Sequence, residues 1–336
     1  MMTMILRRLL ALPLILLIIY TITLTLAWAV PGNPIENPEK RPKPEVIEQM
    51  KKQFNLDSFP RFYVSYLSNA SGFEYLSDVL SGEIAREREM AIKEGIPMPA
   101  RPIFDLGPSL KYDDATVNEL IRSTMPVSIT LGASAMLIAL FLGVGAGVIG
   151  AVKPNSIADL LTLSVSMIGI SLPSFVIGTA MLLTFSLWLG WFPIAQWGSP
   201  TSIIQPAFAL SLPFAAYIAR LTRMGMIDAL GADYIRTARA KGAPEYSVLL
   251  KHALKNAFLP VLSFLGPATA MAMTGSFVIE RVFTVPGMGE HFVNAVQNKD
   301  LFLIIGVVLV FATMLILFNL VVDVLYQWID PRIGKA

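Results

Sequence analysis

The sequence predicts an all-α integral membrane protein with about six transmembrane helices and a large external region after the first of them. Of its 336 residues, 54% are hydrophobic and only 15% are charged, and the mean hydropathy is +0.62. A water-soluble domain of this composition would expose too much apolar surface, whereas long uncharged runs are typical of a chain that crosses a bilayer.

Six segments reach the roughly 20 apolar residues that a bilayer core about 30 Å thick requires. They are 9–30, 126–152, 157–190, 203–227, 259–280 and 301–328. Pro173 in the third segment predicts a kink, because proline removes a helical hydrogen bond. We therefore divide the chain into an N-terminal anchor helix (1–30), an external loop-rich region (31–125) and a five-helix core (126–330) that contains a polar loop at 228–258.

The first segment has two interpretations. Arg7 and Arg8, an apolar run and the triplet Ala27-Trp28-Ala29 resemble a cleavable signal peptide. The apolar run is longer than the roughly 7 to 15 residues of a signal-peptide core, which favours a retained anchor.

Prolines interrupt both ends of the external region, so long helices are not expected near them. They are Pro31, Pro34, Pro38, Pro42, Pro44, Pro97, Pro99, Pro102 and Pro108. Between them, 44–54 and 83–94 carry helix-like charge patterns. The region is either a small cap on the spans or a surface for substrate delivery or receptor docking.

The second segment carries small residues at every fourth position, which places them on one helical stripe. They are Ala135, Ala139, Gly143, Gly147 and Ala151, whereas Gly145 and Gly150 lie off the stripe. Small side chains let another helix approach closely in a membrane, where the hydrophobic effect does not drive helices together. The stripe therefore predicts close packing of two helices.

The distribution of Lys and Arg predicts the orientation in the membrane. Basic residues precede the first span, lie between the second and third, and cluster between the fourth and fifth: Arg7, Arg8, Lys153, Arg220, Arg223, Arg236, Arg239, Lys241, Lys251 and Lys255. The connection 191–202 is uncharged and 281–300 has mixed charge, which places both outside. Both termini are therefore expected in the cytoplasm and the region 31–125 outside.

The basic loop between the fourth and fifth spans reads as two short helices with a sharp break. Asp233 is expected to cap the first helix, Gly242 to end it in a left-handed turn, and Pro244 to stand in the first turn of the second. A basic, exposed helical hairpin between membrane spans suits docking of a partner better than passage of a solute.

Signatures of catalysis and of metal binding are missing from the sequence. It has no phosphate-binding loop, no zinc helix and no nucleophile elbow, and it contains no cysteine. The two histidines, His252 and His291, are expected on opposite sides of the bilayer and so cannot share a metal. A net charge of +2 does not indicate a nucleic-acid partner.

Ionisable groups near the middle of a span would indicate a carrier driven by an ion gradient. The candidates, Asp159, Asp228 and Asp323, all lie near the ends of spans. Asp323 is expected to neutralise Arg220 or Arg223 at the same depth. Because catalytic signatures are missing, uphill transport would need energy from another subunit or from an ion gradient, and the position of these carboxylates argues against the gradient.

The loop carries two runs that identify it: Asp233-Tyr234-Ile235-Arg236-Thr237-Ala238-Arg239-Ala240-Lys241-Gly242, and His252-Ala253-Leu254-Lys255-Asn256-Ala257 followed by Leu259-Pro260. Together they resemble the coupling loop of ABC importer permeases of the dipeptide/oligopeptide subfamily. Four further pieces fit the first permease subunit of that subfamily: Arg7-Arg8, Pro31-Gly32-Asn33-Pro34, Pro286-Gly287-Met288-Gly289 and Asp330-Pro331-Arg332-Ile333.

Some positions depart from the broader importer consensus. Arg236, Thr237 and Ala238 stand where that consensus has Glu-Ala-Ala, although Gly242 is retained. The run 252–255 replaces Ile-x-Leu-Pro, and both changes are similar to the variant of the peptide subfamily. The stretch 85–101 is longer and more charged than the family's pattern, which leaves its role open.

The resemblance implies a type I ABC importer permease fold. It also implies a complex with a second homologous permease, two cytoplasmic ATPase subunits and an external solute-binding protein. This chain would be a non-catalytic half of the pathway that binds no cofactor, with ATP and Mg²⁺ on the ATPases. The first short helix would lie in an ATPase groove through Tyr234, Ile235, Ala238 and Arg239.

The solute path is less clear from the sequence. Polar residues and a proline within the spans are candidates to line it: Ser171, Pro173, Ser174, Ser276 and Asn319. Serine serves helix packing in membranes at least as often. Peptides are the leading substrate, with oligosaccharides and nickel chelates as alternatives.

Two other function classes stay open. An ion-coupled carrier or channel would work without ATPases, and a membrane scaffold or receptor would move no solute. The position of the carboxylates argues against the first class, and the coupling run argues against the second.

Overall fold

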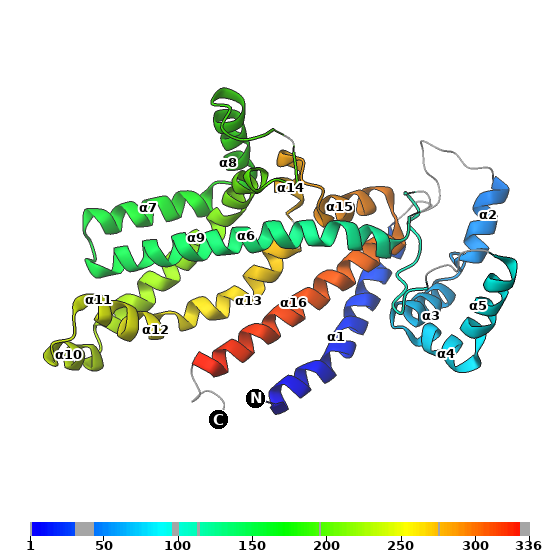
Figure 1. Cartoon of the computed structure of the whole chain (residues 1–336), viewed down its shortest axis with the longest axis horizontal. Coiled ribbons are helices and arrows are strands. Elements are labelled where there is room, and N and C mark those ends of the chain that lie inside the picture. The colour runs from blue at the N-terminus through cyan, green and yellow to red at the C-terminus, as the bar shows by residue number, and fades with distance from the viewer. Residues whose placement is uncertain are drawn as a thin grey trace. The chain divides into compact units, whose positions relative to one another are not determined.

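The computed structural model describes residues 2–30, 44–95, 101–112, 115–194, 196–274 and 276–329, and within them it is almost entirely helical (Figure 1). In chain order, the described helices begin with α1 (Met2–Ala29), α2 (Pro44–Gln53), α3 (Phe59–Ala70), α4 (Phe73–Ser81), α5 (Glu83–Glu94) and α6 (Val117–Val152). They are followed by α7 (Ile157–Ser171), α8 (Ser174–Met181), the π-helix η1 (Leu182–Trp188) and α9 (Pro200–Leu230). The rest are α10 (Asp233–Ala240), α11 (Glu245–Ser247), the π-helix η2 (Val248–Ala253), α12 (Leu254–Ala257), α13 (Leu259–Met273), α14 (Phe277–Phe283), α15 (Met288–Asn298) and α16 (Leu301–Ile329).

The described residues contain 4 helices long and apolar enough to span a bilayer, or up to 6 spans if two bent helix pairs each count as one. The long helices contain Ile5–Ala29, Val117–Val152, Pro200–Leu230 and Leu301–Leu325. The upper figure, in which each bent pair counts as one span, agrees with the predicted number of about six. The motifs at 31–34 and 330–333 lie outside the described residues.

The third predicted span is not one kinked helix but two helices, α7 and α8–η1, bent by 101°. The residue before a proline is forced away from helical backbone angles. Leu172 is accordingly extended (φ −86°, ψ 128°), and Pro173 follows at ψ 136°. The sequence located the interruption correctly but underestimated its size, because two consecutive non-helical residues redirect the chain.

The fifth predicted span, 259–280, also needs correction. Helix α13 ends at Met273, and α14 begins at Phe277 as a separate short helix. The Ser276 hydroxyl accepts a hydrogen bond from the backbone N–H of Ile279 (3.4 Å), so Ser276 caps α14. At its other end α13 forms a bent pair with Glu245–Ala257, at an angle of 56°.

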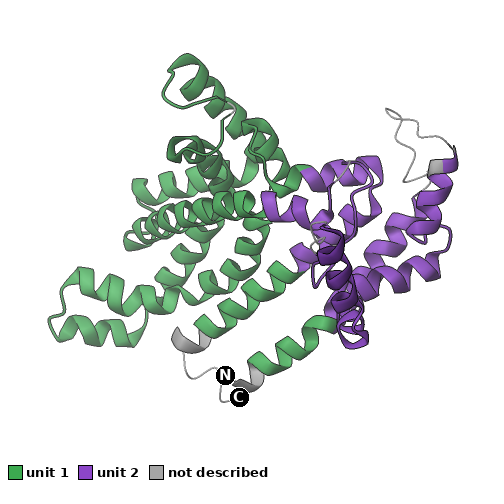
Figure 2. Cartoon of the chain, turned by 45° about the vertical axis from the view of Figure 1, so that its right-hand side comes forward, with its two compact units in different colours: residues 1–13, 124–290, 313–336 green, residues 14–123, 291–312 purple. Residues whose placement is uncertain are grey.

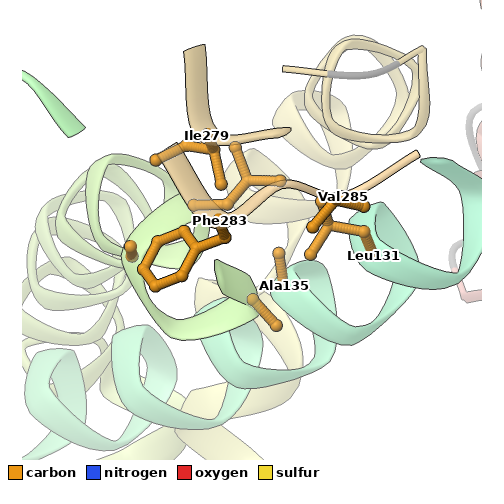
Figure 3. Packing of buried hydrophobic residues seen from close by; sticks show 8 residues of the cluster. Leu131, Ala135, Ile279, Phe283 and Val285 are labelled. Carbon is orange, nitrogen blue, oxygen red and sulfur yellow. The ribbon is translucent and has the colours of Figure 1, made fainter. Parts of the chain in front are cut away.

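The chain divides into two compact units, which Figure 2 distinguishes by colour. Unit 1 comprises 1–13, 124–290 and 313–336, and unit 2 comprises 14–123 and 291–312. In unit 1, α9 packs against α7, α8, α12, α13 and α14. One buried cluster of this unit contains residues from α6, α9 and the α14 region, namely Leu131, Ala135, Ala207, Ala209, Leu210, Ile279, Phe283 and Val285 (Figure 3).

The stripe of small residues on α6 packs closely on α9, as predicted. Ala135 and Ala139 are fully buried. A Cβ atom added at Gly143 would lie 2.6 Å from the backbone oxygen of Ala215, and one at Gly147 would lie 2.5 Å from the Cβ of Thr222. Both clashes involve α9, so the absence of side chains on this stripe sets the distance between the two helices.

In unit 2, the region predicted to be loop-rich is instead helical between residues 44 and 94, where it forms α2 to α5. The helix-like charge patterns at 44–54 and 83–94 correspond to α2 and α5 and are confirmed. Gly72 and Gly82 allow the sharp turns between the later helices, since both have positive φ angles (77° and 74°). The external location of this region stays a prediction.

Buried polar and aromatic groups hold unit 2 together. The buried carboxylate of Asp300 accepts hydrogen bonds from the Ser109 hydroxyl (2.6 Å) and from the backbone N–H of Leu110 (2.9 Å) and Leu303 (3.1 Å). It therefore caps α16 and fixes the 109–110 segment at the same time. Burial raises the pKa of Asp300, and these hydrogen bonds act in the opposite direction.

Substitutions on α6 test the packing of its stripe. We expect Gly147→Ala to lower the free energy of unfolding by about 1–3 kcal/mol, because its methyl group would overlap Thr222. Gly145→Ala is the matched control, since a Cβ atom there meets nothing within 4 Å. Thermal unfolding in detergent measures both, and equal melting temperatures for the two variants would contradict close packing at Gly147.

Candidate functional site

The predicted basic hairpin follows α9 and begins with α10. Its first helix ends in a hydrogen-bonded turn around Gly242, whose φ is +79°. The N–H of Gly242 donates to the carbonyl of Arg239 (2.9 Å), and the N–H of Ala243 donates to that of Ala238 (3.2 Å). This pair of bonds is the Schellman motif, which needs a left-handed residue at its centre. The predicted role of Gly242 is confirmed.

The capping residues differ from the prediction by one position each. Ala232, not Asp233, precedes the first turn of α10 as its N-cap, and Asp233 is the first helical residue. Pro244 likewise stands before α11 rather than within its first turn. Its carbonyl accepts from the N–H of Ser247 (2.9 Å), so it still starts the second helix.

A small apolar core anchors the hairpin to the adjoining ends of α6 and α9. The side chain of Ile235 on α10 is fully buried. It belongs to a cluster of buried residues from α6, α9 and the second part of the hairpin: Ala151, Met226, Ala229, Ile235, Val248, Ala253 and Ala257. Ala238, one turn after Ile235, packs against the same cluster. The buried side of α10 is therefore already occupied by its own chain.

Polar contacts fix the two edges of α10. The Asn256 side-chain amide donates to the Tyr234 hydroxyl (2.9 Å), which links α10 to α12. The Arg239 guanidinium donates to both oxygens of Glu245 (2.6 and 3.2 Å) across the turn. Both pairs are exposed, so each contributes little to stability, but together they restrict rotation of the helix.

The exposed side of α10 differs from the predicted contact face. Ile235 and Ala238 were expected to face an ATPase, and their burial in the hairpin corrects this. The outward side consists of Asp233, Arg236, Thr237, Ala240 and Lys241, all exposed. Buried residues recur at three-residue spacing, so they occupy one side of the helix and leave a polar side opposite.

A buried ion pair lies on α9 just before the hairpin. Arg223 donates to both oxygens of Asp159 at the start of α7 (2.6 and 2.7 Å), and the Asp159 side chain is 1% exposed. The backbone N–H of Asn155 also donates to Asp159 (2.8 Å). This pair corrects the expected pairing of Arg223 or Arg220 with Asp323, whose carboxylate instead lies 2.6 Å from Arg8.

A second buried carboxylate, Glu280 on α14, was missed in the sequence because it falls at the predicted end of a span. It accepts hydrogen bonds from the Ser128 hydroxyl of α6 (2.8 Å) and from the N–H of Gly289 (2.9 Å). A Cβ atom at Gly287 would overlap the Glu280 carboxylate. The run Pro286–Gly289 therefore wraps closely around this carboxylate, and a side chain at either glycine of the run would clash with it.

The environment of Glu280 combines burial with donated hydrogen bonds. Glu280 is buried, with an exposed fraction of 1%. Burial raises the pKa of Glu280, and the hydrogen bonds from Ser128 and Gly289 act in the opposite direction. The Ser128 hydroxyl also accepts from the N–H of Met288 (2.8 Å), so α6 and the start of α15 are linked through one side chain.

The predicted path residues lie on different elements, and several have local structural roles. Ser171 and Pro173 are exposed at the break between α7 and α8, and Ser174 begins α8. Ser276 caps α14. Asn319 on α16 lies against α13, where a Cβ atom added at Gly266 would be 2.6 Å from its side-chain oxygen. A role in the solute path stays a prediction for each of them.

The multi-pass helical architecture and the basic hairpin define a class of membrane transport component. Residues 140–335 match the family described as "Binding-protein-dependent transport system inner membrane component", and residues 1–81 match "Binding-prot-dependent transport system membrane comp, N-term". The chain belongs to this family of binding-protein-dependent transport system inner membrane components. Its membership confirms the predicted fold class, an all-α permease of the ABC importer type.

Curated relatives match nearly the whole chain. The oligopeptide transport system permease protein OppB of Haemophilus influenzae is 40% identical over 329 residues, covering 97% of each chain. The dipeptide transport system permease protein DppB of Bacillus subtilis is 35% identical over 327 residues, covering 97% of this chain and 96% of that protein. A crystal structure of an amino acid ABC transporter with histidines covers 63% of this chain and 94% of its own, with 15% identity and a TM-score of 0.49.

The turn at Gly242 can be tested by hydrogen exchange at the amides of Gly242 and Ala243. A Cβ atom at Gly242 would meet nothing within 4 Å, so a substitution strains only the backbone. We expect Gly242→Val to weaken the turn by more than about 1 kcal/mol and to speed exchange of both amides. Asparagine tolerates this conformation better, so Gly242→Asn should retain most of the protection. Equal exchange rates in the Val variant and the wild type would contradict this account.

The ion pair between α7 and α9 should contribute strongly to stability. We expect Arg223→Ala to destabilise the protein more than Arg236→Ala does, since it leaves Asp159, whose side chain is 1% exposed, without its countercharge. Arg236→Ala is the control, because the pair of Arg236 with Asp233 is 3.5 Å long and highly exposed. Chemical or thermal unfolding in detergent compares them, and similar losses in both variants would rule out a special contribution from Arg223.

Proposed function

We propose that this chain is a permease subunit of an ATP-driven importer, that it forms half of the translocation pathway, and that it receives its driving motion through α10. One observation carries the proposal. The apolar side of α10 is seated on the ends of α6 and α9, whereas its polar side is exposed. When a partner moves the polar side of such a helix, the apolar contacts keep the helix attached to α6 and α9, so the motion is transmitted to the spans.

The route of that motion starts at the cluster around Ile235. Met226 and Ala229 of α9 belong to this cluster, so a displacement of α10 acts directly on the end of α9. From α9, the bidentate pair of Arg223 with Asp159 extends the connection to the start of α7. The hairpin and the ends of α6, α7 and α9 would then move together as one stiff element.

The partners follow from this mechanism and from the family. Two cytoplasmic ATPase subunits would contact α10 and would hold ATP and Mg²⁺, because this chain is a non-catalytic subunit. A second homologous permease would supply the other half of the pathway, and an external solute-binding protein would deliver the solute. The hairpin and both termini would lie in the cytoplasm, and the region 31–125 outside. This arrangement is favoured by the basic residues of the hairpin.

Peptides are the substrate class that we propose. The curated relatives are named for oligopeptide and dipeptide transport. Ser171, Pro173 and Ser174 stand at the broken span, where irregular backbone in a membrane must be buried in protein or line a water-filled cavity. These residues, with Ser276 and Asn319, remain our candidates for the solute path. Membership of a family that depends on a binding protein favours this function over an ion-coupled carrier.

Cross-linking tests the coupling role, and the absence of cysteine from the chain allows a single thiol to be placed. A benzophenone probe on Thr237→Cys, which lies on the exposed side of α10, should capture an ATPase subunit in membranes that contain the whole transporter. The same probe on Leu250→Cys, exposed on η2, is the control for hairpin accessibility.

Capture from Thr237 but not from Leu250 would locate the ATPase on the outward side of α10. Capture from neither position, in a complex that still imports peptide, would contradict the coupling role. Peptide uptake by this chain in vesicles without ATPases would instead establish an autonomous carrier.

A further inference from the structure

The structure carries an exposed apolar surface on α4 that the transport mechanism does not use. Phe73, Leu76 and Leu80 lie on one side of this short helix, with exposed fractions of 68%, 53% and 79%. Their spacing of three and four residues makes a continuous helical stripe. The other side of α4 is polar, and there Asp78 forms an ion pair with Arg101 (2.9 Å). The helix is therefore amphipathic, and its apolar side faces away from its own unit.

The neighbouring helix α3 indicates how far this surface lies from the end of α1, and therefore how deep it lies in the bilayer. It runs antiparallel to the second half of α1, because Phe59 contacts Trp28 (ring centroids 5.6 Å apart) whereas Tyr66, seven residues later, stacks on Tyr20 (5.7 Å). Helix α1 contains Ile5–Ala29, which is long and apolar enough to span a bilayer. As α3 proceeds, it therefore runs back along α1 toward the apolar middle of that span.

The start of α16 gives a second measure of depth within the same unit. Tyr66 also contacts Phe302 (5.8 Å), the second residue of the apolar span α16. Helix α3 continues from Tyr66 to Ala70, which is about 6 Å further at about 1.5 Å per residue. The turn at Gly72 and the first residue of α4, Phe73, therefore lie level with the first turns of α16. The apolar run of α16 begins at Leu301, so this level lies about 6 Å inside the end of that run.

From these two measures we infer that the apolar side of α4 inserts into the bilayer leaflet beside the second half of α1. Ile18, Ile22 and Leu26 on that half of α1 are 50%, 55% and 65% exposed, so an apolar surface already continues along the span. Ile103 lies against Gly72 and is 55% exposed, which extends the same surface beside α4. Lipid is the occupant that an apolar surface at this depth meets.

The charges of α4 specify what kind of lipid contact this is. The sequence of the helix contains Glu74 and Asp78 and no Lys or Arg. Attraction to anionic headgroups therefore does not supply the binding, and burial of apolar side chains does. Insertion should not depend on the anionic lipid content or on ionic strength.

Site-directed spin labelling measures this insertion in the full-length chain, which has no cysteine of its own. Leu76→Cys and Leu80→Cys carry labels on the stripe. Glu74→Cys, on the other side of the same helix, and Arg88→Cys, exposed on α5, are matched controls. Ile22→Cys on α1 is the reference for a lipid-facing label. Collision rates with oxygen and with a water-soluble nickel chelate are recorded in phosphatidylcholine vesicles.

We expect the labels at Leu76 and Leu80 to have an oxygen-to-nickel collision ratio close to that at Ile22 and severalfold above that at Arg88. Adding anionic lipid or salt should leave the ratios unchanged. Labels at Leu76 and Leu80 that collide with nickel as often as the label at Arg88 would overturn the inference. Labels shielded from both reagents would also overturn it, because protein, either this chain or a second copy of it, would then cover the stripe. In each case, α4 is shown to be folded if the EPR spectrum of the Glu74 label has the restricted motion typical of a label on a helix surface.

Discussion

The close approach of α6 to α9 is the constraint on which the rest of unit 1 depends. In a bilayer the surrounding lipid is as apolar as the helix surface, so helices associate through close packing and satisfied polar groups. Gly143 and Gly147 allow α9 to lie directly against α6, where a methyl group at either position would overlap α9 atoms. Helix α9 in turn packs against α7, α8, α12, α13 and α14, so its position decides theirs.

This arrangement explains why the polar hairpin can act as part of the membrane bundle. The residues that fix the hairpin come from both sides of the turn at Gly242. Ile235 and Val248 meet Met226 and Ala229 in one buried cluster, which ties the hairpin to the end of the central helix. A rigid attachment at this point is what a proposed lever requires, because a loosely tethered loop would absorb motion instead of transmitting it.

Three buried carboxylates in the described part of the chain each have hydrogen-bond partners. Asp159 is held by Arg223 and a backbone amide, Glu280 by Ser128 and Gly289, and Asp300 by Ser109 and Leu303. Each of these carboxylates joins segments that are distant in the sequence. In a low-dielectric setting an unpaired carboxylate would be strongly unfavourable, so each pairing also selects one arrangement of the helices that carry it.

The sequence by itself determined the features that depend on neighbours along the chain. The stripe on α6, the place of the interruption at Pro173 and the left-handed turn at Gly242 follow from four-residue spacing and backbone restrictions, and all were predicted correctly. The helical content of 44–94 was underestimated, because the prolines that suggested loops lie at its ends rather than within it.

Only the tertiary structure decided which groups meet. Arg223 pairs with Asp159, 64 residues away, rather than with Asp323, because α7 and α9 are neighbours. The burial of Ile235 likewise depends on where α6 and α9 end, so no pattern within α10 could tell its buried side from its contact side. Such pairings are set by the three-dimensional packing of whole helices, and the spacing of residues within a single segment does not encode that packing.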